Sequence, residues 1–202
     1  MKKNVRIALL GGSYNPPHKA HKEIARILTT LFDLVVVIPC GTRLDKASTN
    51  IIDLSHRMNM VKIAFEDLEK VEIDFYDMEN NVFTPTYLLQ EKYQKLYPDA
   101  EIWHVIGEDI VAGGCRMKSE IHRVWDHGSE IWQNLNFAVL TRLGYGARPD
   151  DLPPHREVIQ LSGLIGSGTE VRRRVMNNEP IGDLVDPKIR EYIIKHRLYQ
   201  KK

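Results

Sequence analysis

Two runs of residues near opposite ends of the chain carry side chains suited to phosphate chemistry. The first run extends from Gly11 to His21 and reads GGSYNPPHKAH. Its two glycines come directly after an apolar stretch, so backbone amides there can approach a phosphate closely. His18 and His21 lie three residues apart at the start of a predicted helix, so both imidazoles project from one side. Beside a polyphosphate they can donate hydrogen bonds to oxygens where negative charge builds up, and the helix N-terminus adds a favourable dipole.

Three other interpretations of this run compete with phosphate binding. A glycine pair after a strand is often only a turn, and histidines at the start of a helix are often solvent-exposed. His18 and His21 also have a spacing at which two side chains can share a zinc ion. Zinc-binding helices more often use the i, i+4 spacing, however, and no obvious third and fourth ligands accompany the pair. The combination of strand, glycine turn, prolines and paired histidines favours a functional site.

The second run extends from Ile165 to Arg174, reads IGSGTEVRRR and opens another predicted helix. Ser167 or Thr169 is suited to cap this helix, because a hydroxyl can accept a hydrogen bond from a backbone amide of the first turn. A capped helix with a solvated basic face is therefore the ordinary interpretation. Hydroxyls, glycines and Arg172 together at a helix N-terminus also form a cradle for an anion.

The pattern of apolar residues predicts strands that alternate with helices. Compact apolar runs predict strands at residues 5–10, 34–38, 71–75, 102–106, 137–141 and 158–161. Helical spacing predicts helices over residues 24–31, 58–68, 88–96 and 187–199. The alternation predicts an α/β fold, Rossmann-like and doubly wound, with a mostly parallel sheet and helices on both faces. Such sheets bind ligands beyond the carboxyl ends of their strands, where both runs fall.

Length and composition set broader limits. The 202 residues are expected to form a single domain, with a C-terminal helical segment at about residues 167–199. No apolar stretch is long enough to cross a bilayer, and the N-terminus has no secretory signal pattern. Cys40 and Cys115 form no metal-finger or disulfide pattern, which favours a cytoplasmic protein. The net charge of +1 argues against bulk binding of nucleic acid. A stretch rich in Gly, Pro and Asp, residues 144–154, predicts a surface loop.

The two runs resemble the signature motifs of the nucleotidyltransferase superfamily. His18-Lys19-Ala20-His21 resembles the H-x-G-H element, with Ala20 in place of glycine. The six residues from Ser167 to Arg172, SGTEVR, resemble the downstream I-S-S-T-x-I-R element, with Gly168 in place of a serine. Two motifs about 150 residues apart, in the expected order, are far more specific than either alone.

Within the superfamily, the chain resembles nicotinate or nicotinamide mononucleotide adenylyltransferases over nearly its whole length. The sequence IPCG that ends at Gly41, followed by Lys46, resembles the V-P-x-G-x(4)-K element, in which the lysine faces phosphates. Gly107 and Asp109 match the G-x-D element that holds the adenosine of ATP; an Asp that caps a helix is the alternative. Trp125, Arg142 and Gly144 resemble the W…R-P-G region, with Leu143 in place of proline. Trp125 is as well suited to a buried structural position as to stacking on a pyridine ring.

The resemblance implies transfer of AMP from ATP to a pyridine mononucleotide, with release of pyrophosphate, in NAD biosynthesis. The catalytic residues it implies are His18, His21, Lys46 and Arg172. The ATP-binding residues it implies are Gly11, Gly12, Ser13, Gly107, Asp109, Ser167 and Thr169. The mononucleotide-binding residues it implies are Asn15, Thr86, Trp125 and Arg142.

Several features stay open at this stage. Thr86 lies where the nicotinate enzymes carry S-Y-T-x-D-T-L, but Leu88 replaces the aspartate, so the choice between nicotinate, nicotinamide and another acceptor stays open. A cytidylyltransferase and a nucleotide-binding module without turnover are the alternatives. The expected partners are small molecules, with no nucleic acid and no membrane, and the sequence leaves homo-oligomer formation open. Mg²⁺ is expected on the phosphates of ATP, with no dedicated metal ligands in the protein.

Overall fold

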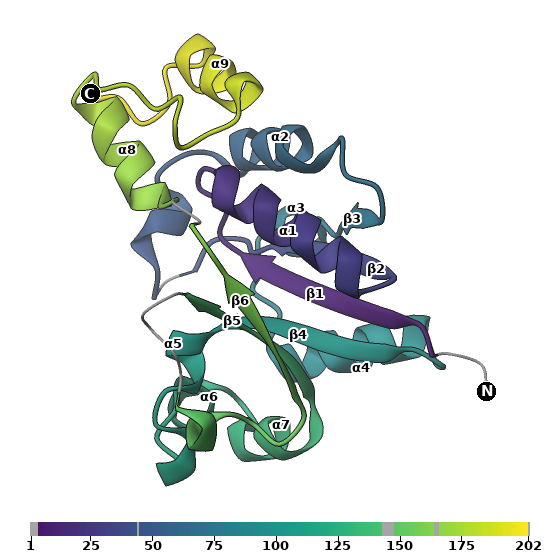
Figure 1. The fold of residues 1–202 in the computed structure, drawn as a ribbon. Helices are drawn as coiled ribbons and strands as arrows, with labels where there is room; N and C mark the ends of the chain where they lie inside the picture. Colours follow the sequence, from purple (N-terminus) through teal and green to yellow (C-terminus); the bar gives the residue numbers. More distant parts are fainter. Residues whose placement is uncertain (1–3, 44, 143–147, 164–165, 202) are drawn as a thin grey trace. The chain divides into compact units, whose positions relative to one another are not determined.

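A six-stranded sheet is present in the computed structural model, which describes residues 4–43, 45–142, 148–163 and 166–201 (Figure 1). Its strands are β1 (Arg6–Gly12), β2 (Leu34–Pro39), β3 (Val71–Ile73), β4 (Glu101–Gly107), β5 (Asn136–Arg142) and β6 (Arg156–Leu161). The strand order is β3-β2-β1-β4-β5-β6, which is the order of the dinucleotide-binding fold. The predicted α/β, Rossmann-like fold is therefore confirmed.

The strands pair in parallel where their register is defined. Arg6 of β1 lies opposite Glu101 of β4, and Trp103 of β4 lies opposite Asn136 of β5. β5 and β6 are also parallel. The continuous apolar runs of β1 and β2 are buried, as expected for strands covered on both faces. Each predicted strand is present, and β3 is two residues shorter than predicted.

The predicted helices are present as α1 (Lys19–Leu31), α2 (Leu54–Phe65), α4 (Thr86–Leu96) and α9 (Pro187–Lys195). The helix expected after Ser167 is α8 (Gly168–Met176). Four short helices were not expected: α3 (Tyr76–Glu79), α5 (Glu108–Val111), α6 (Glu120–Val124) and α7 (Gly128–Asn134). One or two turns are too few to show a helical period in the sequence, which explains why the pattern did not predict them.

Residues 144–154 differ in part from the predicted surface loop. Residues 144–147 lie outside the described residues. A 3₁₀ turn, η3 (Pro149–Asp151), follows them, and Asp151 is buried. Its carboxylate accepts a hydrogen bond of 3.1 Å from the backbone amide of Cys115. The prediction of an exposed loop is therefore wrong at Asp151, because this side chain serves as a backbone acceptor inside the fold.

Contacts divide the chain into two compact units, which are described separately. The first unit consists of Met1–Leu10, Leu31–Val36 and Thr84–Gly163, and the second unit of Gly11–Thr30, Val37–Phe83 and Leu164–Lys202. The expectation of a single domain stays a prediction. Both α8 and α9 of the C-terminal segment belong to the second unit. In the described part of the chain, no helix is both long and apolar enough to cross a membrane.

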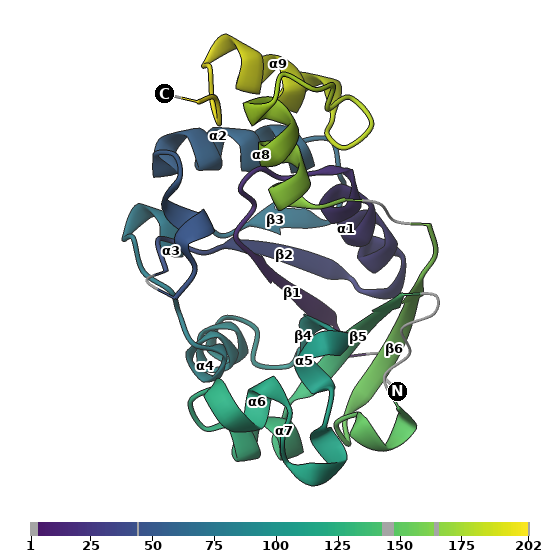
Figure 2. The same cartoon turned by 90° about the vertical axis from the view of Figure 1, so that its left-hand side faces the viewer.

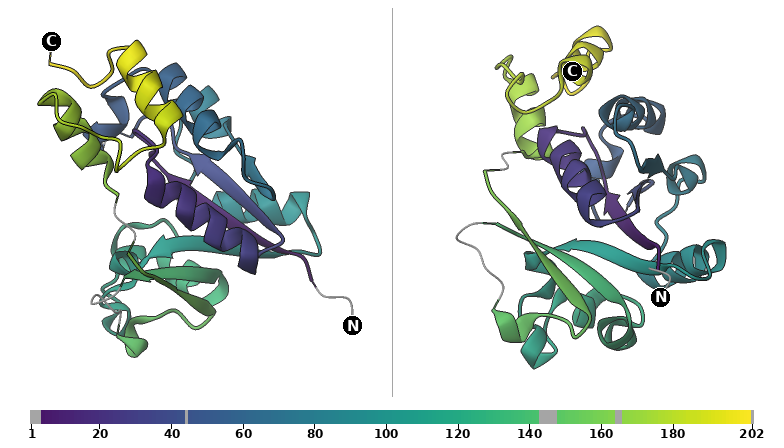
Figure 3. Two further views of the ribbon diagram at one scale, coloured as in Figure 1. Left: turned by 45° about the horizontal axis from the view of Figure 1, so that its top comes forward. Right: turned by 45° about the vertical axis from the view of Figure 1, so that its right-hand side comes forward.

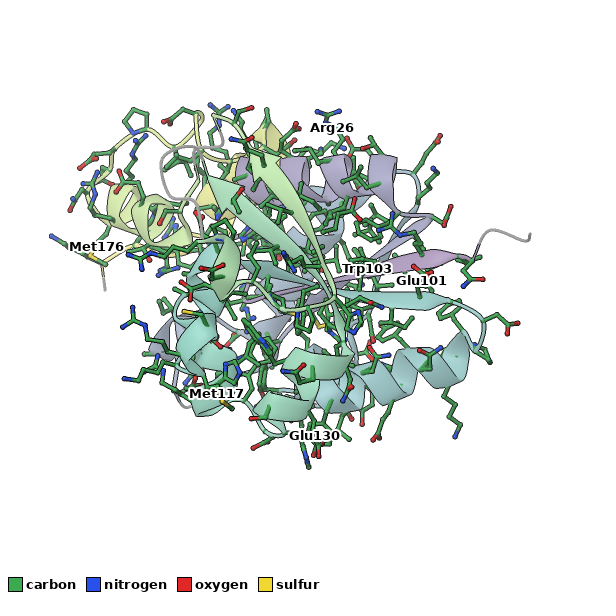
Figure 4. All side chains as sticks on the ribbon, turned by 60° about the horizontal axis from the view of Figure 1, so that its bottom comes forward. Arg26, Glu101, Trp103, Met117, Glu130 and Met176 are labelled. Atoms are coloured by element: carbon green, nitrogen blue, oxygen red, sulfur yellow. The ribbon has the colours of Figure 1, made fainter. Side chains whose placement is uncertain are left out.

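The first unit has an apolar core beneath β4 and β5, close to which α5, α6 and α7 lie (Figure 2). Trp132 and Phe137 are among its buried residues. Arg6 of the same unit packs on Trp103, with its guanidinium carbon 4.7 Å from the ring centroid. Trp103 and Glu101, labelled in Figure 4, lie near each other on β4, and Glu101 is 3.9 Å from Arg6.

The second unit joins α1 to the C-terminal segment. The backbone amide of Lys19, at the start of α1, donates 2.8 Å to the carbonyl of Leu184. On α9, Lys188 forms an ion pair of 2.6 Å with Glu66 at the end of α2. Figure 3 shows α9 beside α2 in both views. These contacts join Leu184 to the start of α1 and α9 to the end of α2.

Candidate active site

The turn after β1 is held by the buried side chain of Tyr14. The ring of Tyr14 is 1% exposed, and its centroid lies 4.8 Å from that of His21 and 5.7 Å from that of Phe65. A Cβ atom at Gly12 would lie only 2.8 Å from the Tyr14 ring. Glycine is therefore required at Gly12 for this close packing, and Tyr14 supports the imidazole of His21. Sequence reasoning gave Tyr14 no role, because an aromatic residue in a turn carries no distinctive signal.

The two histidines of the motif lie face to face. Their ring centroids are 3.6 Å apart and the rings are inclined by 20°. The backbone amide of His18 donates a hydrogen bond of 3.2 Å to Nδ1 of His21. An imidazole nitrogen that accepts a hydrogen bond carries no proton, so the proton of neutral His21 is on Nε2. His21 is thus a neutral donor that presents Nε2–H.

The electrostatic environment keeps His21 uncharged. Burial, and then the charges of His18 and Lys46, hold the pKa of His21 well below its usual value of 6.5. The effect of Lys46 on this pKa also indicates that its charge reaches the histidine pair. Lys46 is exposed and precedes the 3₁₀ turn η1 (Ala47–Asn50). Electrostatic interactions therefore connect three predicted catalytic residues of the second unit, His18, His21 and Lys46.

The start of α8 packs directly against the histidine motif. A Cβ atom at Gly166 would lie 2.5 Å from Nδ1 of His18 and 2.8 Å from Cβ of Ala20. A Cβ atom at Gly168 would lie 3.2 Å from the backbone oxygen of Asn15. The two runs that the sequence places about 150 residues apart are thus in contact. Ile165 of the second run lies outside the described residues.

The arginines of α8 have different partners. Arg172 donates a hydrogen bond of 2.6 Å to the backbone oxygen of Asn15 and one of 3.1 Å to the hydroxyl of Thr169. It forms no ion pair with any carboxylate among the residues that the structure describes. Arg173 instead pairs with Glu170 and Glu179, and Arg174 with Glu170 and Asp183. Arg172 therefore differs from Arg173 and Arg174, because no acidic side chain in the described part of the chain neutralises its charge.

The hydroxyls at the same helix start are accessible. The side chain of Ser167 accepts a hydrogen bond of 3.4 Å from the backbone amide of Glu170, as expected of an N-cap. Ser167 and Thr169 are both exposed. The capping interpretation of Ser167 is therefore correct, and it is compatible with phosphate binding because a hydroxyl can both accept and donate.

Asn15 is buried and connects α8 with the C-terminus. Its side-chain oxygen accepts a hydrogen bond from the hydroxyl of Tyr199, and its backbone oxygen accepts from Arg172. Tyr199 is 6% exposed, and burial raises the pKa of its hydroxyl. Sequence reasoning missed Tyr199, because a tyrosine three residues from the end of a chain carries no signal of this contact. The binding of a mononucleotide by Asn15 stays a prediction.

Five of the predicted residues belong to the first unit: Thr86, Gly107, Asp109, Trp125 and Arg142. Gly107 ends β4, and the carboxylate of exposed Asp109 covers the space that a Cβ at Gly107 would occupy. Asp109 is inside α5 rather than at its cap, so the capping alternative is wrong. Trp125 is partly buried and packs against the core of this unit, as does Tyr87 beside Thr86. The backbone of Arg142 ends β5; Leu143 and Gly144 lie outside the described residues.

Family comparisons agree with the motifs. A model described as cytidylyltransferase-like matches residues 9–174, which include both histidines and Arg172. The chain belongs to the cytidylyltransferase-like family. Two curated relatives that are similar over nearly the whole chain carry the same name. A "Probable nicotinate-nucleotide adenylyltransferase" of Albidiferax ferrireducens is 29% identical, with 96% of this chain and 98% of the relative covered. A protein of the same name from Kineococcus radiotolerans is 28% identical, with 94% of this chain and 89% of the relative covered.

Solved structures give the same result. Nicotinic acid mononucleotide adenylyltransferase of Plasmodium falciparum, complexed with NaAD, is 25% identical, with a TM-score of 0.78 over 97% of this chain and 98% of that chain. A second structure of that protein, complexed with APC, is 24% identical with a TM-score of 0.75 and shows the same fold. The resemblance expected from the two motifs is therefore confirmed for this member of the cytidylyltransferase-like family.

Proposed function

We propose that this chain transfers AMP from ATP to nicotinate mononucleotide and releases pyrophosphate, a step of NAD biosynthesis. The observation that carries the proposal is the contact between the histidine motif and the start of α8. It gathers in one unit two imidazoles, two hydroxyls and an arginine that pairs with no acidic side chain of the described residues. The names of the full-length relatives support nicotinate as the acceptor.

In this reaction the phosphate of the mononucleotide attacks the α-phosphorus of ATP. A new P–O bond forms, the bond to the β-phosphate oxygen breaks, and its electron pair leaves with pyrophosphate. A phosphate monoester is already ionised at neutral pH, so the protein need not remove a proton. Its contribution is positioning and electrostatic stabilisation.

Each residue then has a specific part. The Nε2–H of neutral His21 donates to an oxygen of the α-phosphate, where charge increases in the transition state. His18 has the same role beside it. Arg172 and Lys46 neutralise the departing pyrophosphate, and Ser167, Thr169 and the amides after Gly11 bind the phosphate chain. Gly107 and Asp109 bind the adenosine.

Magnesium belongs to the substrate in this proposal. Among the described residues, no three His, Cys, Asp or Glu side chains form a group that could hold a metal. The polar groups around the histidine motif are donors and cations, which suit phosphate oxygens. Mg²⁺ is therefore expected to arrive bound to ATP, with phosphate oxygens and water as its ligands.

Pyrophosphate release tests the proposal directly. The purified chain is assayed with ATP or CTP against nicotinate mononucleotide, nicotinamide mononucleotide and other phosphate monoesters. The expected result is turnover with ATP and a higher kcat/KM for nicotinate mononucleotide than for any other acceptor. Preference for CTP would assign a cytidylyltransferase instead. ATP binding in a calorimeter without pyrophosphate release from any acceptor would assign a nucleotide-binding module.

A further inference from the structure

Arg57 of α2 is one of the largest fully buried side chains among the described residues, with 0% exposure. Burying a guanidinium is costly unless its donors are satisfied and its charge is balanced. Burial lowers the pKa of Arg57, yet a guanidinium remains protonated at any physiological pH. No ion pair joins Arg57 to a carboxylate in the described part of the second unit. The reason for keeping this cation must lie in its other partners.

Those partners are backbone carbonyl oxygens of three separate segments. Arg57 donates to Ser13, in the turn after β1, at 2.6 and 3.1 Å. It donates to Cys40 at 2.7 Å and to Gly41 at 3.4 Å, directly after β2. It also donates to Thr49 in η1, at 3.1 Å. One planar, rigid fork of donors therefore fixes three loops relative to one another.

Two of these three segments lead to residues of the candidate active site. The turn at Ser13 continues to His18 and His21. Thr49 is hydrogen-bonded to Lys46, since its backbone amide and its hydroxyl donate hydrogen bonds of 2.9 and 2.8 Å to the Lys46 carbonyl. We propose that Arg57 is a positioning residue for the transfer reaction, which holds the histidine turn and the Lys46 loop in register without touching the substrate. The proposal rests on the proposed function, because it concerns the same site.

The test is a double-mutant cycle of Arg57→Lys and Lys46→Ala. Lysine keeps the charge but has one nitrogen, which cannot reach three loops at once. We expect R57K to remain folded and to lower kcat about 30-fold, because displacement of catalytic groups by about 1 Å can cost about 100-fold. The fold decrease in kcat caused by Lys46→Ala should be at least about fivefold smaller in R57K than in the wild type, since Arg57 and Lys46 act together. The matched control is Arg26→Lys on α1, where Arg26 (labelled in Figure 4) is exposed and pairs with Glu23.

A purely structural role gives a different result. R57K would then unfold at a lower temperature but retain wild-type kcat in an assay run well below that temperature, and this outcome overturns the proposal. The proposal is also overturned if the decrease in kcat of the double variant equals the product of the decreases in the two single variants. If R57K does not fold, Thr49→Val removes the hydroxyl link to Lys46 while leaving Arg57 in place, and wild-type kcat in T49V counts against the proposal.

The four proteins of the cycle, which are the wild type, R57K, K46A and the double variant, are also titrated with ATP by calorimetry. If the wild type shows no turnover with any acceptor, the proposed function fails. Coupling between Arg57 and Lys46 in the Kd for ATP still decides the role of Arg57, so the two failures are distinguishable.

Discussion

Nη1 of Arg172 donates a hydrogen bond of 2.6 Å to the backbone oxygen of Asn15, 157 positions earlier in the chain. The contact ties the start of α8 to the segment that leads into the histidine motif. Because no carboxylate pairs with Arg172 in the described residues, its charge is available to an anion. The contact also makes the geometry of the site dependent on residues at both ends of the chain.

Replacing His21 by alanine should lower kcat about 100-fold or more, because it removes a donor to the α-phosphate, worth about 3 kcal/mol in the transition state. KM should change little, and the unfolding temperature should stay near that of the wild type. Steady-state kinetics and thermal unfolding measure both. His155→Gln, at an exposed position of the first unit, is the control. Near-normal turnover of H21A would refute the assigned role.

The neighbouring arginines provide a matched comparison. Arg172→Ala should lower kcat/KM about 100-fold, because the pyrophosphate loses a charged partner. Arg173→Ala should change kcat/KM less than about threefold, because Glu170 and Glu179 already neutralise this exposed side chain. Initial rates at varied ATP concentration test both variants. Equal losses in the two would show that the helix contributes only general positive charge.

Removing the hydroxyl of Tyr199, near the C-terminus, should lower both stability and kcat/KM through the loss of its hydrogen bond to Asn15. Tyr199→Phe leaves the side-chain oxygen of Asn15 without this donor, which should cost about 1 kcal/mol of stability and about tenfold in kcat/KM. Tyr192→Phe is the control, because its hydroxyl bonds to His56 and Asn59 on α2. Y192F should lose stability alone. A tenfold loss of kcat/KM in Y192F, or none in Y199F, contradicts the prediction.

A methyl group at Gly166 should disrupt the contact between the two motifs. Gly166→Ala places Cβ 2.5 Å from Nδ1 of His18 and 2.8 Å from Cβ of Ala20. Overpacking of this kind costs about 1–3 kcal/mol, and displacement of His18 should also lower kcat. Adding Ala20→Gly should recover part of the stability, because it removes one of the two clashes. Gly182→Ala, with its nearest neighbour at 3.6 Å, should be tolerated; equal unfolding temperatures for G166A and G182A would disprove the clash.

Buried His104 should make the protein sensitive to acid. Burial lowers the pKa of His104 to about 4, and its Nε2 lies 2.9 Å from the side-chain oxygen of Gln90. The unfolded chain takes up this proton below about pH 6.5, whereas the folded chain does so only near the lowered pKa. Stability should therefore be fully present above about pH 6.5 and fall as the pH drops toward the lowered pKa.

Urea unfolding at about pH 7.5 and about pH 4.5 measures this effect, which is about 2 kcal/mol for one such histidine. His104→Gln should show a smaller loss between the two pH values, and His155→Gln should behave like the wild type. An unchanged loss in H104Q would show that other groups cause the acid sensitivity.

Local sequence was enough to determine the alternation of strands and helices, because buried strands need apolar runs and helices need a periodic face. It also predicted a site at His18, His21 and the start of α8, since glycines, imidazoles and hydroxyls beside a strand end form a recognisable set. Helices of one or two turns carry no such period, and a lone Asp such as Asp151 does not reveal that it will be buried.

Only the tertiary structure decided which side chains share a site and which charges remain available. The run Arg172-Arg173-Arg174 is uniform as a sequence, yet nearby acidic side chains on the same segment pair with Arg173 and Arg174, and Arg172 has no carboxylate partner among the described residues. The contacts of Tyr14, Arg57 and Tyr199 could not be predicted locally, because they depend on packing and on oxygen atoms that other segments supply. Contacts between distant residues depend on the path of the chain, and a pattern read along the chain does not contain that path.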